Sequence, residues 1–169
     1  MKVIMYATQS VNGYLATETE ETPWSGAAWR NYYKTSRGFK AMIVGRRTYQ
    51  IMKRIEEFKK IGSPFTIVLS HFPAGDTGAN LAYAKSPLKA MEILKENRFT
   101  KVVVAGGGKL NASFMKIGLV DELWLDIEPF VFGTGIKIFH EDFFKAKLKL
   151  LGFKKLSKDT VQLRYKVVK

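Results

Sequence analysis

"VVVAGGGKLNASF" (residues 102–114) places three consecutive glycines between an apolar run and a segment with helical spacing. The run 102–105 is uncharged, as in strands covered on both faces, and it predicts a central strand of a sheet. Glycine loses more backbone freedom on folding than any other residue. Two explanations therefore compete for Gly106, Gly107 and Gly108: a tight turn that needs positive φ, or a ligand that contacts the backbone itself.

Three glycines in succession favour the ligand. In an α/β sheet, ligands bind at the carboxyl ends of the strands, where a helix start offers free N–H groups and a partial positive charge. A pyrophosphate suits such a site. The glycines do not complete a G-x-G-x-x-G motif, and no acidic residue ends a strand about 20 residues later, so a Rossmann domain is not predicted.

Three further apolar segments predict strands of the same kind, at residues 3–7, 41–44 and 65–69. Apolar and polar residues then alternate along 122–128 and 161–167, which is typical of strands with one solvated face. The basic segment 144–156 and the segment 160–168 predict an antiparallel hairpin at the end of the sheet. We expect one α/β domain over residues 1–169, with a mixed, mostly parallel central sheet flanked by helices.

Two helices are predicted between these strands. In the first, over 86–97, Ser86 is the expected N-cap and Pro87 stands in the first turn. The second follows Gly108 and ends at Gly118. The expected apolar faces are Leu88, Met91 and Leu94 in the first helix and Leu110, Phe114 and Ile117 in the second.

Composition narrows the function. The formal net charge is +13, and a basic surface attracts nucleic acid, membranes or small polyanions. Many lysines alternate with apolar residues, as in "KAKLKLL" at 145–151, which is typical of a solvated strand face. No nucleic-acid motif is present, so we do not expect nucleic acid as a partner, whereas a dinucleotide phosphate would also be attracted.

The sequence holds no cysteine and two histidines, so no metal site is expected. It has no uncharged apolar run of about 18 residues and no signal peptide, and a cytoplasmic protein without a membrane span is the expectation.

Several segments together resemble the dihydrofolate-reductase superfamily, in particular its branch shared with the reductase domain of riboflavin biosynthesis. They are "VIMYATQSVNGYLA" at 3–16, "TPW" at 22–24, "MIVGRRTYQIM" at 42–52, "IVLSHFP" at 67–73 and "VVVAGGGKLNASFMKIGLVDELWLDIEPFVFGTG" at 102–135. The match covers nearly the whole chain, and its specificity lies in the order and spacing of the segments. It implies a dihydrofolate-reductase-like fold that binds NADPH at the carboxyl edge of the sheet.

The resemblance also implies which residues hold the cofactor. Ala7 and the loop near Leu15 would hold the nicotinamide end, and Ser70 and His71 would line the adenosine side. The pyrophosphate would lie near Gly106, Gly107, Gly108, Lys109 and Leu110. In "GRRTY", Gly45 would let the chain turn, Thr48 would face the phosphates, and Arg46 or Arg47 would reach the 2′-phosphate.

Physical chemistry agrees with this role for the arginines, because a guanidinium pairs bidentately with a phosphate monoester and thereby favours NADPH over NADH. The alternative is that Arg46 and Arg47 project into water. Two positive charges at the positive end of a helix are unfavourable, which indicates an anion nearby that compensates for them.

The substrate side departs from the folate reductases. Those enzymes carry a carboxylate on the first helix, five residues after the tryptophan of the Pro-Trp pair; here that tryptophan is Trp24 and the fifth residue is Trp29. Trp24, Trp29 and Tyr33 are the expected substrate contacts, because aromatic rings can stack on a flat substrate. Packing of Trp29 and Tyr33 between helix and sheet explains them equally well.

Reduction of a C=N bond also needs a proton, and Asp126 on the polar face of the 122–128 strand is the candidate donor. An ordinary carboxylate that faces solvent is the alternative. "NGYLA" at 12–16 resembles the loop that closes over the nicotinamide, although a plain turn also explains its glycine. Gly133 and Gly135 lie where the riboflavin branch has a dimer contact nearby, so a homodimer is expected.

The resulting hypothesis is an NADPH-dependent reductase that transfers a hydride to a planar heterocyclic or imine-type small molecule. The enzyme alternatives are an authentic dihydrofolate reductase and a stand-alone reductase of a ribosylamino-pyrimidine phosphate. A basic nucleic-acid-binding or NADPH-sensing protein is the alternative without catalysis.

Overall fold

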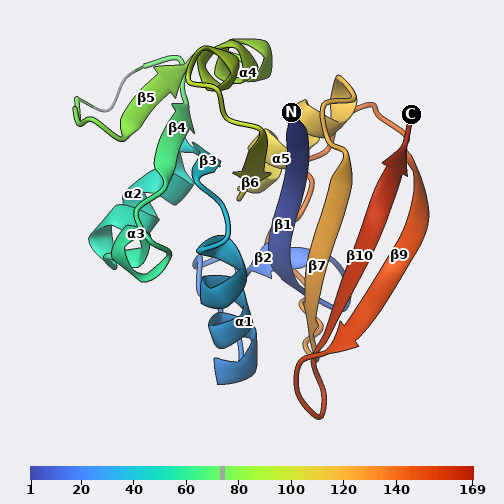
Figure 1. Cartoon of the computed structure of the whole chain (residues 1–169). Helices are drawn as coiled ribbons and strands as arrows, with labels where there is room; N and C mark the ends of the chain where they lie inside the picture. Colours follow the sequence, from blue (N-terminus) through green and yellow to red (C-terminus); the bar gives the residue numbers. More distant parts are fainter. Residues whose placement is uncertain (73–74) are drawn as a thin grey trace.

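The structure is a computed structural model that describes residues 1–72 and 75–169; Pro73, which ends the segment "IVLSHFP", lies outside them. In this part of the chain an eight-stranded sheet carries the fold (Figure 1). Its strands in spatial order are β5 (Leu81–Ala84), β4 (Phe65–Leu69), β3 (Ala41–Gly45), β6 (Lys101–Val104), β1 (Lys2–Ser10), β7 (Glu122–Glu128), β10 (Val161–Val168) and β9 (Lys147–Lys155).

The pairing of these strands confirms the predicted mixed sheet. All pairs from β5 across to β7 are parallel, whereas β10 runs antiparallel to β7 and to β9. The hairpin β9–β10 therefore forms one end of the sheet (Figure 1). A separate short ribbon pairs β2 (Tyr14–Ala16) with β8 (Ile136–Lys137).

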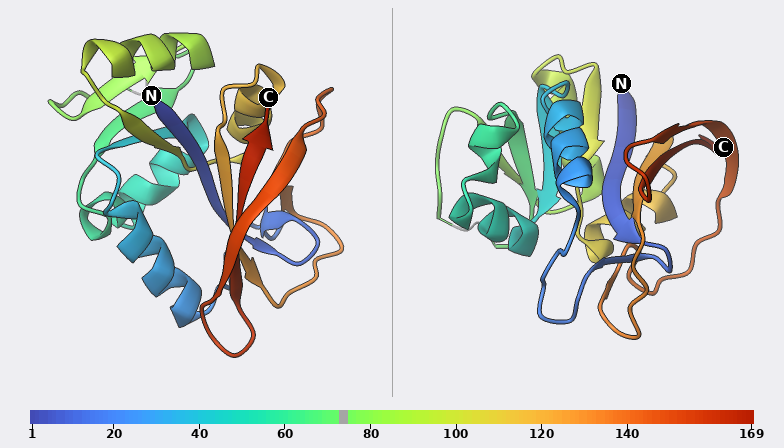
Figure 2. Two further views of the ribbon diagram at one scale, coloured as in Figure 1. Left: turned by 45° about the vertical axis from the view of Figure 1, so that its right-hand side comes forward. Right: turned by 90° about the horizontal axis from the view of Figure 1, so that it is seen from below.

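Helices cover both faces of the sheet, as the rotated views in Figure 2 show. The helices are α1 (Gly26–Ser36), α2 (Arg46–Arg54), α3 (Glu57–Lys60), α4 (Pro87–Glu96) and α5 (Gly108–Lys116). Side chains of α4 and α5 share one core cluster with alternate residues of the strands. Side chains of α1, α2 and α3 pack against the cluster on the other face. Both faces of the parallel strands are thus buried, which explains their uninterrupted apolar sequences.

Two details of the predicted helix faces are wrong. Leu88 is 60% exposed and Ile117 is 46% exposed, whereas Ala90, Met91 and Leu94 of α4 are buried. Steps of three residues fall short of a full helical turn, so Leu88 in the first turn of α4 has moved off the buried face. Ile117 lies beyond the last turn of α5, at its C-cap.

The glycine turn between β6 and α5 has two separate structural reasons. Gly106 has φ of 89°, a left-handed conformation that disfavours any side chain. Gly108 packs against the β8 segment, because a Cβ there would lie 2.4 Å from the carbonyl oxygen of Lys137. The backbone nitrogen of His140 also donates to the Gly108 carbonyl at 3.1 Å. Turn geometry and close packing therefore account for two of the three glycines.

We expect Gly108→Ala to lower the free energy of unfolding by about 1–3 kcal/mol, the usual cost of overpacking. A thermal or urea unfolding curve measures this loss. Gly133→Ala is the matched control, because a Cβ at Gly133 meets nothing within 4 Å. Equal stability of the two variants would show that the β8 segment does not press on Gly108.

Candidate functional site

The starts of α2 and α5 lie side by side at the carboxyl edge of the parallel strands. They follow neighbouring strands, β3 and β6, and Gly45 donates its backbone N–H to the Gly106 carbonyl at 2.8 Å. A Cβ at Gly107 would lie 3.5 Å from Oγ1 of Thr48. The structure therefore brings together the "GRRTY" segment and the glycine turn, as the sequence predicts.

Neither helix start has a side-chain cap. Their N-cap residues are Gly45 and Gly107, and the first turns contain no acidic residue. The helices α1 and α4 differ, because Ser25 and Ser86 cap them through their hydroxyl oxygens. Free N–H groups and a partial positive charge at two adjacent helix starts form an arrangement that can hold an anion.

Basic side chains surround this point. Arg46, Arg47 and Lys109 are all exposed. Arg47 forms a salt bridge with Glu20, and the hydrogen bond to this carboxylate raises the Arg47 pKa. Glu20 is thus the compensating anion that the two arginines indicated, although the sequence did not single it out.

The predicted adenosine side lies at the same edge. Ser70 directly follows β4, and its N–H donates to the Ala84 carbonyl at 2.9 Å. Its hydroxyl accepts from the backbone nitrogen of Phe72 at 3.1 Å, and His71 is exposed. Ser70 therefore extends the sheet beyond β4, while His71 is available to a ligand.

The predicted nicotinamide side joins β1 to the β2 ribbon. Ala7 is buried in β1, and Leu15 in β2 lies 3.9 Å from the position of a Cβ on Gly106. Gly13 has φ of 87° and donates its N–H to the Ser10 carbonyl at 3.1 Å. A turn thus explains Gly13, and closure of this loop over a ligand stays a prediction.

Asp126 lies in a buried polar network and not at the surface. It has no exposed area; its Oδ2 accepts from Tyr6 Oη at 2.6 Å and Asn31 Nδ2 at 3.0 Å, and its Oδ1 accepts from Gln162 Nε2 at 2.7 Å. Burial raises the Asp126 pKa, while these hydrogen bonds oppose the rise. The alternative of a carboxylate that faces solvent is wrong, because α1 and the strands beside β7 cover Asp126. Its catalytic role stays a prediction.

The three aromatic residues predicted to contact the substrate lie in two places: Trp24 precedes α1, and Trp29 and Tyr33 lie on α1. Trp24 is 9% exposed and stacks on Phe132, with a centroid separation of 6.0 Å. Trp29 and Tyr33 stack on each other along α1, with centroids 5.6 Å apart. Tyr33 also packs against the core cluster beneath α1. Both rings remain partly exposed, so packing and substrate contact are compatible for this pair.

Glu128 is a buried carboxylate that sequence reasoning did not single out. It is fully buried in β7 and accepts from Ser25 N at 2.6 Å, Ser25 Oγ at 3.0 Å and Thr160 Oγ1 at 2.7 Å. These bonds fix the start of α1 against the sheet and the β9–β10 turn. The signal was present in "ELWLDIE", where three acids, Glu122, Asp126 and Glu128, lie on one face of the strand with Trp124.

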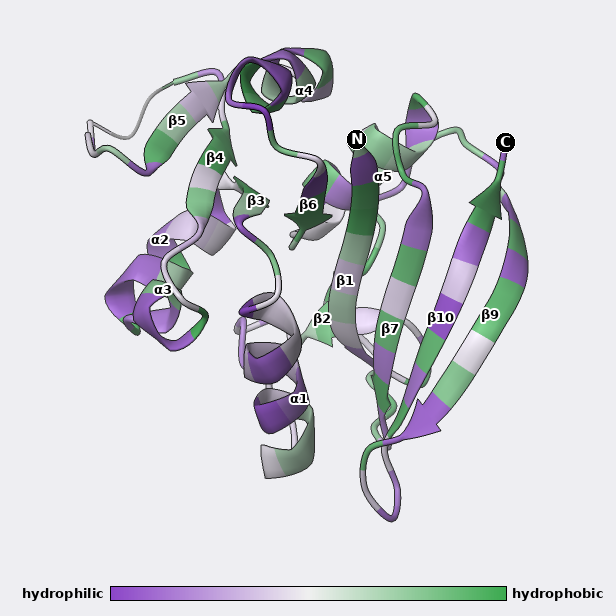
Figure 3. Ribbon diagram, in the orientation of Figure 1, coloured by the Kyte–Doolittle hydropathy of each residue, from purple (hydrophilic) through white to green (hydrophobic). Residues whose placement is uncertain are grey.

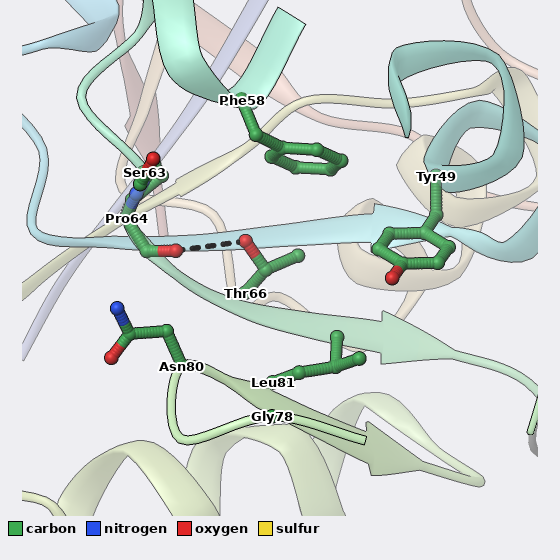
Figure 4. Close-up of a pocket in the computed structure, with 8 residues that line it drawn as sticks. All are labelled: Tyr49, Phe58, Ser63, Pro64, Thr66, Gly78, Asn80 and Leu81. Atoms are coloured by element: carbon green, nitrogen blue, oxygen red, sulfur yellow. Dashed lines mark hydrogen bonds between the residues drawn. The ribbon is translucent and has the colours of Figure 1, made fainter. Parts of the chain in front are cut away.

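The described part of the chain also contains open cavities at the opposite edge of the sheet. One, of about 180 Å³, lies at the amino ends of β4 and β5; Figure 4 shows Tyr49 and Phe58 beside it and Thr66 bonded to the Pro64 carbonyl. A second, more polar cavity, of about 480 Å³, is lined by residues that include Arg37 and Lys40. Neither includes a predicted site residue.

Within residues 1–72 and 75–169, no group of three or more His, Cys, Asp or Glu side chains could hold a metal ion. No helix in these ranges combines the length and apolar character needed to cross a membrane.

Known proteins resemble the chain along its length. It is 27% identical over 169 residues to the uncharacterized protein YwjB of Bacillus subtilis, with 97% of each chain covered. A putative riboflavin biosynthesis protein from Shewanella sp. PV-4 has a structure that covers 100% of both chains, with a TM-score of 0.84 at 17% identity. A pyrimidine reductase-like protein from Corynebacterium diphtheriae covers 99% of this chain and 92% of its own, with a TM-score of 0.76 at 18% identity.

A larger protein shares the fold over part of its length. The Thermotoga maritima diaminohydroxyphosphoribosylaminopyrimidine deaminase/5-amino-6-(5-phosphoribosylamino)uracil reductase matches 99% of this chain with 56% of its own, at a TM-score of 0.73 and 16% identity. These structures confirm the predicted dihydrofolate-reductase-like fold. Residues 1–162 match the RibD C-terminal domain, and the chain therefore belongs to that family.

Proposed function

We propose that the chain is an NADPH-dependent reductase that transfers a hydride to a planar heterocycle of pyrimidine type. The observation that carries this proposal is the pair of uncapped helix starts, α2 and α5, which meet at the glycine turn. Free N–H groups of both helices and the arginines of α2 suit a dinucleotide with several phosphates.

The residues at this edge fit NADPH better than NADH. Arg46 and Arg47 open α2 and are exposed, so their guanidinium groups can reach a phosphate monoester. Gly107 leaves room for a pyrophosphate beside the α5 amides. Ser70 and His71 follow β4, the neighbour of the strand that precedes α2. When bound, the reduced nicotinamide supplies the hydride.

Reduction of a C=N bond adds a hydride to carbon and a proton to nitrogen. Asp126 is the carboxyl group that we propose as the source of this proton. Asp126 is fully buried, and Asn31, the partly exposed member of the network, donates to it through its amide and cannot relay its proton. Asn31 must therefore move aside before a substrate can take the proton from Asp126. The raised Asp126 pKa keeps this group protonated to higher pH than an ordinary aspartate.

Residues of α1 and the family of the chain support the proposed substrate class. Trp29 stands where folate reductases carry a carboxylate, so a pterin would lack its usual anchor. The stacked pair Trp29 and Tyr33 offers flat apolar surface to a heterocycle. One similar structure is named a pyrimidine reductase-like protein and another a (phosphoribosylamino)uracil reductase, which supports a pyrimidine; a ribosylamino-pyrimidine phosphate is the specific candidate.

Binding and activity assays test the whole proposal. Calorimetric titration with NADPH should show binding, and a screen of reducible pyrimidines, pterins and imines should show turnover with a pyrimidine. Turnover of dihydrofolate alone would instead favour an authentic folate reductase. Binding of DNA at about 150 mM salt without binding of NADPH would favour the non-enzymatic alternative.

We also propose that two copies of the chain associate through β9. Figure 3 shows apolar segments along this edge strand. Leu150 is 52% exposed, Leu151 is 50% exposed and Phe153 is 74% exposed. Phe143, just before β9, is 98% exposed. At about 200 Å² for a fully exposed large side chain, these four would bury about 500 Å², a large part of the roughly 800 Å² per partner in a stable interface.

Arg46→Gln should weaken NADPH binding about tenfold and leave NADH binding unchanged, because a charged hydrogen bond to the 2′-phosphate is lost. Calorimetric titration with both nucleotides measures this. Arg54→Gln, at the other end of α2, removes the same charge and should change neither affinity. If both variants weaken NADPH equally, general charge and not a phosphate contact attracts the nucleotide.

Asp126→Asn should abolish turnover and leave NADPH affinity nearly unchanged. In the unaltered protein, turnover should fall as pH rises through the raised Asp126 pKa, because the proton donor is then ionised. Glu122→Gln in the same strand is the control, and melting temperatures verify that both variants fold. Retained turnover in the folded Asp126→Asn protein would remove Asp126 from the mechanism.

Phe153→Lys should convert the dimer to a monomer in light scattering, because it adds a charge to the apolar edge. High salt should strengthen the unaltered dimer by screening the lysines that β9 brings together. Leu88→Lys is the control, since Leu88 is also exposed, at 60%, but lies on α4, which packs at the other end of the sheet from β9. A monomeric unaltered protein at all salt concentrations would contradict the association.

A further inference from the structure

Glu20 holds the arginine that the proposed function assigns to the cofactor. Its carboxylate forms a salt bridge with Arg47 in the first turn of α2. The Glu20 side chain is 25% exposed, whereas that of Arg47 is 78% exposed. The carboxylate is therefore the more covered partner, and it lies against an arginine that remains open to solvent.

A tight turn fixes Glu20 in this place. The N–H of Thr17 donates to the Glu21 carbonyl at 2.9 Å, and the N–H of Glu20 donates to the Thr17 carbonyl at 3.1 Å. Glu20 has φ of 68°, a left-handed conformation that is unfavourable for a residue with a Cβ. The backbone of this turn is thus locally strained at Glu20, and the Glu20 carboxylate lies at the start of α2.

The turn continues from the ribbon beside the glycine turn. Leu15 of β2 lies next to Gly106, and Gly135 approaches the Ala16 carbonyl so closely that a Cβ would lie 2.4 Å from it. The chain therefore enters residues 17–21 from a closely packed position. From this segment the Glu20 side chain reaches the start of α2, where the proposed function places a phosphate.

The charge balance at α2 explains what Glu20 does there. The helix start is uncapped, two arginines add positive charge, and no acid stands in the first turn. Glu20 supplies one negative charge from a distant segment. A phosphate monoester brings up to two negative charges and three acceptor oxygens, so it is a stronger partner for the same guanidinium.

We propose that Glu20 occupies the place of the cofactor's 2′-phosphate and must be displaced before that phosphate can pair with Arg47. This inference rests on the proposed function. Glu20 then sets selectivity in a particular way: it lowers the affinity for nucleotides that carry the 2′-phosphate and leaves the others unaffected.

Glu20→Gln tests this role, with NADPH and NADH as the probes in calorimetric titrations at fixed ionic strength. We expect NADPH to bind about two- to fivefold more tightly, the range of an exposed salt bridge that no longer has to be broken, and NADH to bind as before. Glu21→Gln makes the same change in charge one residue away, on an exposed side chain, and should leave both affinities unchanged. Glu20→Asp keeps the charge and should bind NADPH more weakly than Glu20→Gln.

The remaining outcomes separate the role of Glu20 from the proposed function. Unchanged or weaker NADPH binding by Glu20→Gln, while the unaltered protein binds NADPH, would reject the role of Glu20 and leave the proposed function intact. Equal gains in Glu20→Gln and Glu21→Gln would also reject it, because overall charge would then explain both. Failure of all the folded proteins to bind either nucleotide would reject the proposed function and this inference together.

Discussion

The hydrogen bond from Gly45 to the Gly106 carbonyl joins the two helix starts on which the site depends. It is possible because β3 and β6 are neighbours in a parallel sheet, so the segments after them emerge at one edge. Positive φ at Gly106 and the close packing at Gly108 then direct the start of α5 toward that of α2. The adjacent, uncapped helix starts at this edge, where we propose that a dinucleotide binds, are thus a consequence of strand order combined with the absence of side chains at three positions.

Two buried carboxylates on β7 organise the other half of the site. Glu128 bonds the start of α1 and the turn before β10, while Asp126 bonds Tyr6, Asn31 and Gln162. Helix α1 and strands β1 and β10 therefore meet at one strand, and unpaired carboxylates there would be costly. The same network that orients α1 places the buried carboxyl group of Asp126 beneath the helix that presents Trp29 and Tyr33. Asp126 therefore both holds α1 against the sheet and is the proton donor of the proposed reaction.

The central strands and the helix over 86–97 could be predicted because local patterns determine them: uninterrupted apolar runs and a Ser-Pro helix start. The burial of Leu88 and Ile117 was predicted wrongly, since helical spacing alone does not tell which turn leaves the sheet. The glycine run at 106–108 by itself indicated a ligand that contacts the backbone, whereas the cofactor roles of the residues in "GRRTY" and of Lys109 and Leu110 came from the family resemblance. Glu20 could not be predicted as the partner of Arg47, because a left-handed turn brings it across the fold and no local pattern encodes that contact.

The central claim is that the backbone amides at the starts of α2 and α5 bind the cofactor phosphates. A titration of isotope-labelled protein with NADPH, followed by amide NMR, tests it most directly. We predict that the largest shifts occur at residues 46–48 and 106–110, and that inorganic pyrophosphate moves a subset of the same signals. Saturable NADPH binding with shifts confined to the amino ends of β4 and β5, or to β9, would contradict the account.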